Sequence, residues 1–229
     1  MNAKKAVLIL FILALGVISA NAQLSLGVKA GFNTSNFSGL ETSGYVNYEN
    51  PYKPGFNVGL AAQYMFTPQV GIESGLYYSL LGAKQQYKES LGNIVSVSLT
   101  ETNSPSYLQL PVSVLYKFAV GRDLYLYPSA GIYVGYGIAG KTKIETDVSS
   151  LLVDGSVDGE SNFFGEDEDG EEYTNRLDAG LTFGLNLQYS KFVIGLGYDL
   201  GLTKINKESY SDSKDIKNVN IKVSLGYFF

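Results

Sequence analysis

Cysteine, histidine and tryptophan are all absent from the 229-residue sequence. Without cysteine there is no disulfide framework, thiol nucleophile or thiolate metal site. Without histidine the chain lacks the usual general base and the commonest metal ligand at neutral pH. Serine–histidine catalysis is therefore excluded, and we expect a protein that is not an enzyme and holds no cofactor. A serine–lysine or carboxylate-only mechanism stays open, with Glu73 and an interior lysine as the pair to inspect.

Long hydrophobic runs are scarce as well. One unbroken run of apolar or small residues, 6–19, is too short to span a bilayer as a helix. Two lysines precede it and Ala-Asn-Ala follows it at 20–22, which is typical of a cleaved signal peptide rather than an anchor helix. We predict a signal peptide at 1–22 and one outer-membrane β-barrel domain at 23–229. Cleavage removes both lysines and changes the formal charge from −5 to −7, a sign that argues against nucleic-acid binding.

Glycine, tyrosine and phenylalanine are plentiful, with 26, 18 and 12 residues. These residue types suit twisted β structure. Apolar residues recur at every second position in eight runs, each near the length of about 9–11 residues that a membrane β-strand needs. The runs are 24–32, 56–66, 70–80, 108–118, 124–138, 177–189, 192–202 and 219–229.

The connections between these runs alternate in length. Short ones lie at 67–69, 119–123 and 190–191, and long ones lie at 34–54, 85–104, 141–174 and 206–216. Outer-membrane barrels have short periplasmic turns and long extracellular loops. We therefore predict an all-β fold, an eight-stranded antiparallel up-and-down transmembrane β-barrel in the bacterial outer membrane, with both mature termini periplasmic. Pro111 and Pro128 fall inside runs, and we expect a bulge or a lost hydrogen bond at each.

The polar face of the runs distinguishes a membrane barrel from a soluble one. In a soluble barrel such as a lipocalin the polar face meets water and should be rich in lysine and glutamate. Here it consists mostly of glycine, serine, asparagine, glutamine and threonine, which suits an interior filled by side chains. We expect its few charges to pair with one another inside the barrel. These charges are Lys29, Glu73, Lys117, Arg176, Asp178, Asp199 and Lys222.

The apolar face carries aromatic residues beside the short connections. In a barrel these residues lie at one level and form the periplasmic aromatic girdle that is typical of outer-membrane proteins. Aromatic residues also favour strands in general, but clustering at one end of the strands favours the girdle. Its members are Tyr64, Phe66, Tyr116, Phe118, Tyr189, Phe192, Tyr227 and Phe229.

Four short motifs resemble those of the PorT-like family of outer-membrane β-barrel proteins, also called the porin family. They are Tyr-Leu-Gln-Leu-Pro at 107–111, Gly-Ile-Tyr-Val-Gly at 131–135, Arg-Leu-Asp-Ala-Gly at 176–180 and Tyr-Asp-Leu-Gly-Leu-Thr at 198–203. The resemblance implies the barrel fold over the mature chain, and it implies that a last strand ending on Phe229 is read by the barrel-assembly machinery. It implies no activity, because members share a fold more than a function.

The third long connection is acidic, with nine acids and no base from 154 to 172. Clustered carboxylates can bind calcium or bridge to lipopolysaccharide phosphates, but the spacing does not match an EF-hand. We interpret the segment as a solvated acidic loop and keep metal binding as the alternative. The candidate metal ligands are Glu166, Asp167, Glu168, Asp169, Glu171 and Glu172.

Two functions fit this sequence best. The first is a structural or surface-interaction protein whose interior is filled by side chains and whose long extracellular loops contact an unknown extracellular or periplasmic protein. The second is a narrow porin-like channel for ions or small solutes, since glycines on the polar face leave space. Inner tyrosines such as Tyr77, Tyr125, Tyr127 and Tyr133 fill that space and favour the first. An enzyme that uses the loop acids is a third, weaker hypothesis. Outer-membrane lipids and lipopolysaccharide are expected partners of either barrel.

Overall fold

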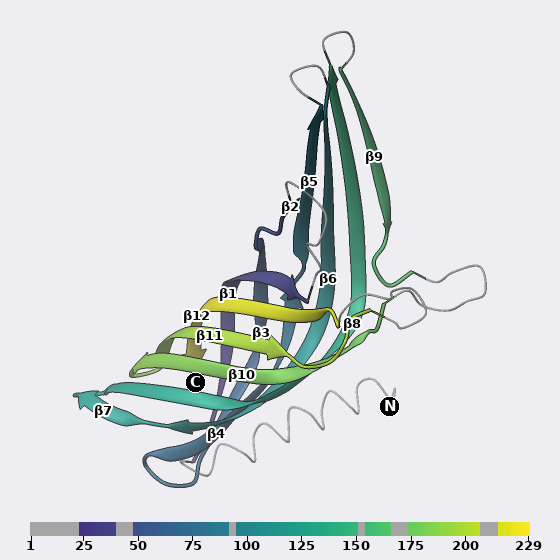
Figure 1. Ribbon diagram of the computed structural model, residues 1–229. Coiled ribbons are helices and arrows are strands. Elements are labelled where there is room, and N and C mark those ends of the chain that lie inside the picture. The colour runs from purple at the N-terminus through teal and green to yellow at the C-terminus, as the bar shows by residue number, and fades with distance from the viewer. Residues whose placement is uncertain (1–22, 40–47, 92–94, 151–153, 166–173, 207–214) are drawn as a thin grey trace, which may run out of the picture.

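A computed structural model describes residues 23–39, 48–91, 95–150, 154–165, 174–206 and 215–229. These residues form twelve β-strands (Figure 1). The strands are β1 Leu24–Ser38, β2 Tyr48–Glu49, β3 Lys53–Met65, β4 Val70–Leu80, β5 Ala83–Leu91, β6 Val95–Tyr116, β7 Phe118–Gly121, β8 Leu124–Ser150, β9 Asp154–Asn162, β10 Leu177–Tyr189, β11 Phe192–Gly201 and β12 Lys217–Phe228. No helix in the described residues is long and apolar enough to span a membrane.

Eight of the strands follow one another in a continuous series of pairings, always antiparallel. The pairings run β1–β3–β4–β6 and continue β8–β10–β11–β12. β12 pairs in turn with β1 through twelve residue pairs, from Gly27 with Phe228 to Ser38 with Lys217. The strand pairings therefore return to their starting strand, and we call this set the strand ring.

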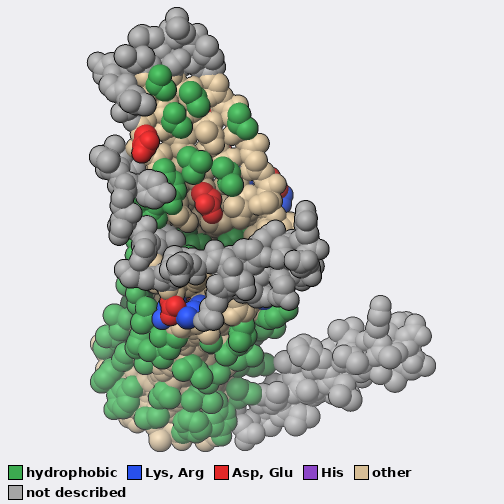
Figure 2. All heavy atoms as spheres, turned by 45° about the vertical axis from the view of Figure 1, so that its right-hand side comes forward, with side chains coloured by type: hydrophobic (Ala, Val, Ile, Leu, Met, Phe, Trp, Pro, Cys, Tyr) green, Lys and Arg blue, Asp and Glu red, His purple; other side chains and the backbone are tan. Residues whose placement is uncertain are grey.

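Alternation along each strand decides which side chains enter the ring. In β10, Asp178, Thr182 and Asn186 are buried, whereas Phe183 and Leu185 are exposed. A two-residue period places alternate side chains on opposite faces of a strand. The outer surface is consequently apolar, and hydrophobic side chains cover the lower part of the molecule in Figure 2.

The prediction of eight strands and four long loops is wrong above the ring. β5, β6, β8 and β9 extend as an antiparallel sheet (Figure 1), and β2 pairs with β5. We call this the protruding sheet. It contains much of the predicted loops 85–104 and 141–174, which were assigned as loops because they lie between the alternating apolar runs.

The prolines affect the ladder where expected, although without a bulge at either one. Between β4 and β6 the pairing stops at Ser74 with Val112 and resumes at Tyr77 with Gln109, so the ladder lapses opposite Pro111. Pro128 pairs with Leu185 of β10 on one side. On its other side the β6–β8 ladder ends one residue before Pro128, at the pair Leu115–Ser129. The register shift between β6 and β8 lies instead at Ser106 and Tyr107. Each proline thus lies where its missing N–H is tolerated.

Candidate functional site

The polar interior of the strand ring contains a first ion pair between two of the predicted interior charges. Lys29 of β1 is 7% exposed and forms an ion pair with Oε1 of Glu73 on β4. The amide of Gln63 donates a hydrogen bond of 2.6 Å to the other carboxylate oxygen. Gly226 leaves room for the lysine stem, because a Cβ there would lie 2.7 Å from Lys29 Cγ. Both oxygens of the Glu73 carboxylate therefore have partners within the fold.

A second ion pair joins β11 and β12. Lys222 Nζ lies 2.7 Å and 2.8 Å from the two carboxylate oxygens of Asp199. Thr182 and Asn220 donate further hydrogen bonds of 2.7 Å and 3.1 Å to the same carboxylate. A Cβ at Gly197 would lie 2.6 Å from Lys222 Cε. Glycine on the inner face is therefore needed where a lysine stem crosses the ring.

Asp178 and Lys117 have neutral partners rather than opposite charges. Asp178 is 1% exposed and accepts hydrogen bonds from Tyr133, Asn218 and Thr203 at 3.2, 3.0 and 3.3 Å. Lys117 donates to the side-chain oxygens of Gln63 and Gln188 at 2.9 and 2.7 Å, and its ammonium lies 5.4 Å from the ring centre of Tyr127. Amides and hydroxyls thus supply the hydrogen bonds of these two charges.

A cavity of about 90 Å³ lies between the two ion pairs. Lys29, Glu73, Asp199 and Lys222 line it, together with serine, asparagine and tyrosine side chains. This volume is large enough to hold ordered water. The interior between the ion pairs thus keeps an open space that charged and polar side chains line.

An apolar cluster crosses the ring at the end that carries the protruding sheet. Its buried members are Phe37, Leu81, Ala83, Tyr107, Phe163, Phe164 and Ile205. Phe164 packs edge-on against Tyr107, with ring centres 5.9 Å apart, and the Arg176 guanidinium lies 5.0 Å from the Phe164 ring centre. Arg176 also donates to the backbone oxygens of Gly137 and Phe164. We call the seven buried apolar residues the upper cluster.

A second apolar cluster crosses the ring at the end with the short turns. It consists of Ala61, Leu115, Tyr127, Val193 and Phe228, with Met65 and Tyr77 packed against it. We call it the lower cluster. Two of the four inner tyrosines predicted to fill space, Tyr77 and Tyr127, contribute to it. The upper cluster was not predicted, because Phe163 and Phe164 lie in the predicted acidic loop, where two adjacent phenylalanines were the only signal.

A family model described as outer membrane protein beta-barrel domain matches residues 19–207. The chain belongs to this family. The fold is accordingly an all-β, antiparallel outer-membrane barrel fold, and the protein is a small barrel of the bacterial outer membrane. No curated protein matches the sequence.

Solved structures of other outer-membrane proteins resemble this member of the beta-barrel domain family at low identity. Ail, the attachment invasion locus protein of Yersinia pestis, is 18% identical over 90% of this chain and 99% of its own, with a TM-score of 0.37. Neisserial surface protein A is 12% identical over 89% and 97%, with a TM-score of 0.38. OprG of Pseudomonas aeruginosa is 14% identical over 90% and 95%, with a TM-score of 0.40. These values carry no inference about function.

The predicted girdle residues lie on the outer surface of this family member. Seven of them are at least 37% exposed, including Phe229 at 69%, and Tyr227 is half-buried. Several contact one another: ring centres are 5.3 Å apart for Tyr64–Phe66, 4.6 Å for Tyr116–Phe118 and 5.1 Å for Phe192–Tyr227. They adjoin the short turns, at the end of the ring opposite the protruding sheet.

The acidic segment is not the single loop that was predicted. Its first part forms β9, where Glu160 lies 2.5 Å from Lys141 of β8. The hydrogen bond from Lys141 holds the pKa of Glu160 below its usual value. The six candidate metal ligands from 166 to 172 lie outside the described residues, and within the described residues no group of three acids could hold a metal ion.

A larger hollow of about 300 Å³ opens at the foot of the protruding sheet. Phe37, Phe163, Ile205 and Ile216 form its apolar side, and amide, hydroxyl and carboxyl groups of β5, β6, β8 and β9 form the rest. The upper cluster separates this hollow from the polar cavity below. No sequence pattern predicted the hollow, because its residues come from segments that are far apart in the chain.

Proposed function

We propose that the strand ring is a closed, eight-stranded up-and-down barrel and that the protein acts as a structural or surface-interaction protein rather than as a channel or an enzyme. The protruding sheet and the long connections face outward to contact another molecule. The finer assignment to the PorT-like family is part of this proposal. It rests on the four sequence motifs, two of which lie within ring strands β6 and β8, whereas the other two overlap β10 and β11.

The proposed orientation places the short turns and both mature termini in the periplasm. Short turns are typical of the periplasmic end of such barrels, and outward aromatic side chains are typical of the level at which a barrel meets the membrane–water interface. The outward girdle at that end supports the orientation. Outer-membrane lipids and lipopolysaccharide then surround the apolar surface, and the barrel-assembly machinery reads the last strand during insertion.

One observation carries the proposed lack of conduction: apolar clusters cross the ring at both ends. Tyr107 and Phe164 are packed in the upper cluster, and Tyr127 and Phe228 in the lower cluster. An ion that passed either cluster would lose its water between packed aromatic and aliphatic side chains, which is costly. The positive groups of Lys117 and Arg176 lie against rings of the clusters and would not replace the water of a cation. Two such barriers in series make the interior a filled core.

A narrow channel is the second candidate. The polar cavity between the ion pairs supports it, since Lys29, Glu73, Asp199 and Lys222 would face a passing ion. Movement of aromatic rings at both ends would then be required for conduction.

Single-channel recording in a planar bilayer tests the proposal, after heat-modifiable gel migration has verified folding. We expect no stable conductance steps. Reproducible steps would contradict it, and Lys29→Met should then change ion selectivity. The control Lys143→Met removes a lysine from the protruding sheet and should leave selectivity unchanged if the current passes through the ring.

A further inference from the structure

β9 is an edge strand of the protruding sheet (Figure 1). It pairs with β8 from Lys141–Asn162 to Ser149–Asp154, and the described part of the chain places no strand on its other side. All residues of β9 whose side chains are described, 155–162, are exposed. An edge of this kind presents unpaired backbone N–H and C=O groups that can bind an additional strand.

The protruding sheet has one charged face and one mixed face, which we call the apolar face because it carries the exposed aliphatic residues. Cross-strand partners share a face, and among the residues whose side chains are described the register places four lysines and five acids on the charged, polar face. They are Lys84, Lys88, Lys141, Lys143, Glu49, Glu145, Asp147, Asp158 and Glu160. The opposite side carries Val97, Ile144, Val148 and Val157, which are 38%, 41%, 39% and 73% exposed. Hydrophobic side chains are spread over the protruding sheet in Figure 2.

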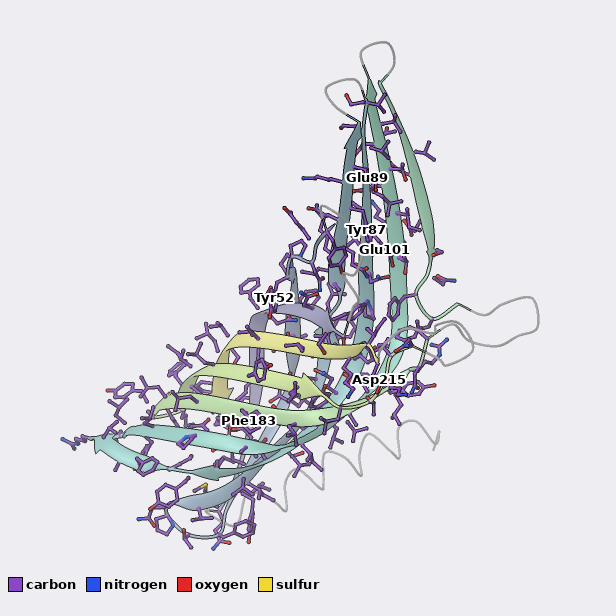
Figure 3. All side chains as sticks on the ribbon, in the orientation of Figure 1. Tyr52, Tyr87, Glu89, Glu101, Phe183 and Asp215 are labelled. Atoms are coloured by element: carbon purple, nitrogen blue, oxygen red, sulfur yellow. The ribbon has the colours of Figure 1, made fainter. Side chains whose placement is uncertain are left out.

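This apolar face carries acids but no base among the described residues. Glu89 pairs with Val97, and Glu101 pairs with Ile144, which assigns both glutamates to this face. Figure 3 shows them with Tyr87 on the protruding sheet. The apolar face reaches the free edge at Val157, the most exposed of the four aliphatic residues.

Two glycines on the apolar face of β9 leave open space at the edge. Gly155 and Gly159 flank Val157 at two-residue spacing, and a Cβ on either glycine would meet no atom within 4 Å. Large side chains on a neighbouring strand commonly cover such glycines. An added strand would therefore find room for bulky apolar side chains beside both positions.

The charges at this edge favour a basic occupant. Asp158 on the polar face has no ion-pair partner among the described residues, whereas Glu160 pairs with Lys141. A second copy of β9 contains acids and no base, so it offers no cation for Asp158. Like charges opposite one another destabilise a strand pair, so a second copy fits this edge poorly.

We propose that β9 binds an extended segment of another protein as an added strand, with bulky apolar side chains beside Gly155 and Gly159 and a basic side chain opposite Asp158. This inference rests on the proposed surface-interaction function and assigns its contact site and partner chemistry. Main-chain hydrogen bonds to β9 supply the common part of the affinity, and the side chains supply specificity.

The test uses the full chain in zwitterionic nanodiscs and two labelled nine-residue peptides. In one peptide lysine alternates with phenylalanine and valine, and in the other glutamate replaces every lysine. We expect the basic peptide to bind more tightly by fluorescence anisotropy. We also expect it to slow hydrogen exchange at the backbone amides of 154–162.

Two charge reversals form a matched pair. Asp158→Lys should lower the affinity for the basic peptide about three- to fivefold at low salt, the range of exposed ion pairs. Glu89→Lys changes the net charge by the same amount but lies on β5, which β6 and β8 separate from β9. It should leave the affinity for the basic peptide nearly unchanged. Both side chains are exposed, so folding should tolerate either change.

Three outcomes would overturn the inference. They are equal binding of both peptides, exchange protection outside 154–162, and protection of β9 by raised protein concentration alone, which would assign the edge to a second copy. The same samples are recorded in a planar bilayer. Conductance steps would contradict the proposed function, whereas absent steps combined with absent peptide preference would contradict only the strand-addition site.

Discussion

Lys222 and Asp199 form an ion pair in which one ammonium contacts both carboxylate oxygens, at 2.7 Å and 2.8 Å. The carboxylate is nearly inaccessible, at 4% exposure of the Asp199 side chain. Removal of one partner from such a pair leaves a buried charge without compensation, which is more destabilising than removal of both partners. This asymmetry makes the pair suitable for mutation.

Lys222→Met should lower the free energy of unfolding by about 3–5 kcal/mol, because Asp199 remains buried without a cation. The double variant Lys222→Met/Asp199→Asn should recover most of this loss. Reversible urea unfolding in liposomes measures both. Lys141→Met on the exposed pair with Glu160 is the control and should have no measurable effect. An equal loss in the single and double variants would show that the charge pairing does not matter.

The two faces of β10 can be compared at adjacent positions. Leu185 is 48% exposed on the outer surface and Asn186 is 7% exposed inside. Leu185→Arg should cost about 2–4 kcal/mol near the bilayer midplane, whereas Asn186→Ser should cost much less. The measurement is again unfolding in liposomes. If both changes had the same effect, the assignment of the lipid-facing side would be wrong.

Gly197 tests the need for space beside an interior lysine. Gly197→Val would press a side chain against Lys222, and we expect a loss of about 1–3 kcal/mol, the usual cost of overpacking. Gly159→Val is the matched control, because a Cβ there meets no atom within 4 Å. Thermal unfolding followed by gel migration compares the two variants. Similar melting of both would contradict the close approach of the lysine stem.

Tyr48 of β2 should ionise unusually late. Burial, followed by the charges of Tyr87 and Glu101, raises the pKa of Tyr48 from 10.0 to about 12. The folded state thus favours the neutral phenol. The resulting stabilisation of the β2–β5 contact is complete below pH 10 and is lost as the pH rises toward 12. Tyrosinate absorbance of wild type minus Tyr48→Phe should show a step near pH 12, and a step near pH 10 would contradict the burial of this phenol.

The residues inside the strand ring were only partly predictable from the sequence. The seven interior charges were identified because they lie at the polar positions of alternating runs. Their partners were not identifiable, since Lys29 and Glu73 are 44 residues apart and meet only through the register of two strand pairs. The upper cluster was missed for a similar reason, because Phe163 packs with Phe37, which is far away in the sequence.

Local periodicity determined what the sequence could establish alone. A two-residue alternation assigns each side chain to one of two faces, and turn lengths assign the ends of strands, so the strands of the ring and their apolar surface followed directly. Only the tertiary structure decided which charges pair, how apolar clusters cross both ends and how far the strands extend above the ring. These properties depend on register and on distant contacts, which periodicity along one strand does not contain.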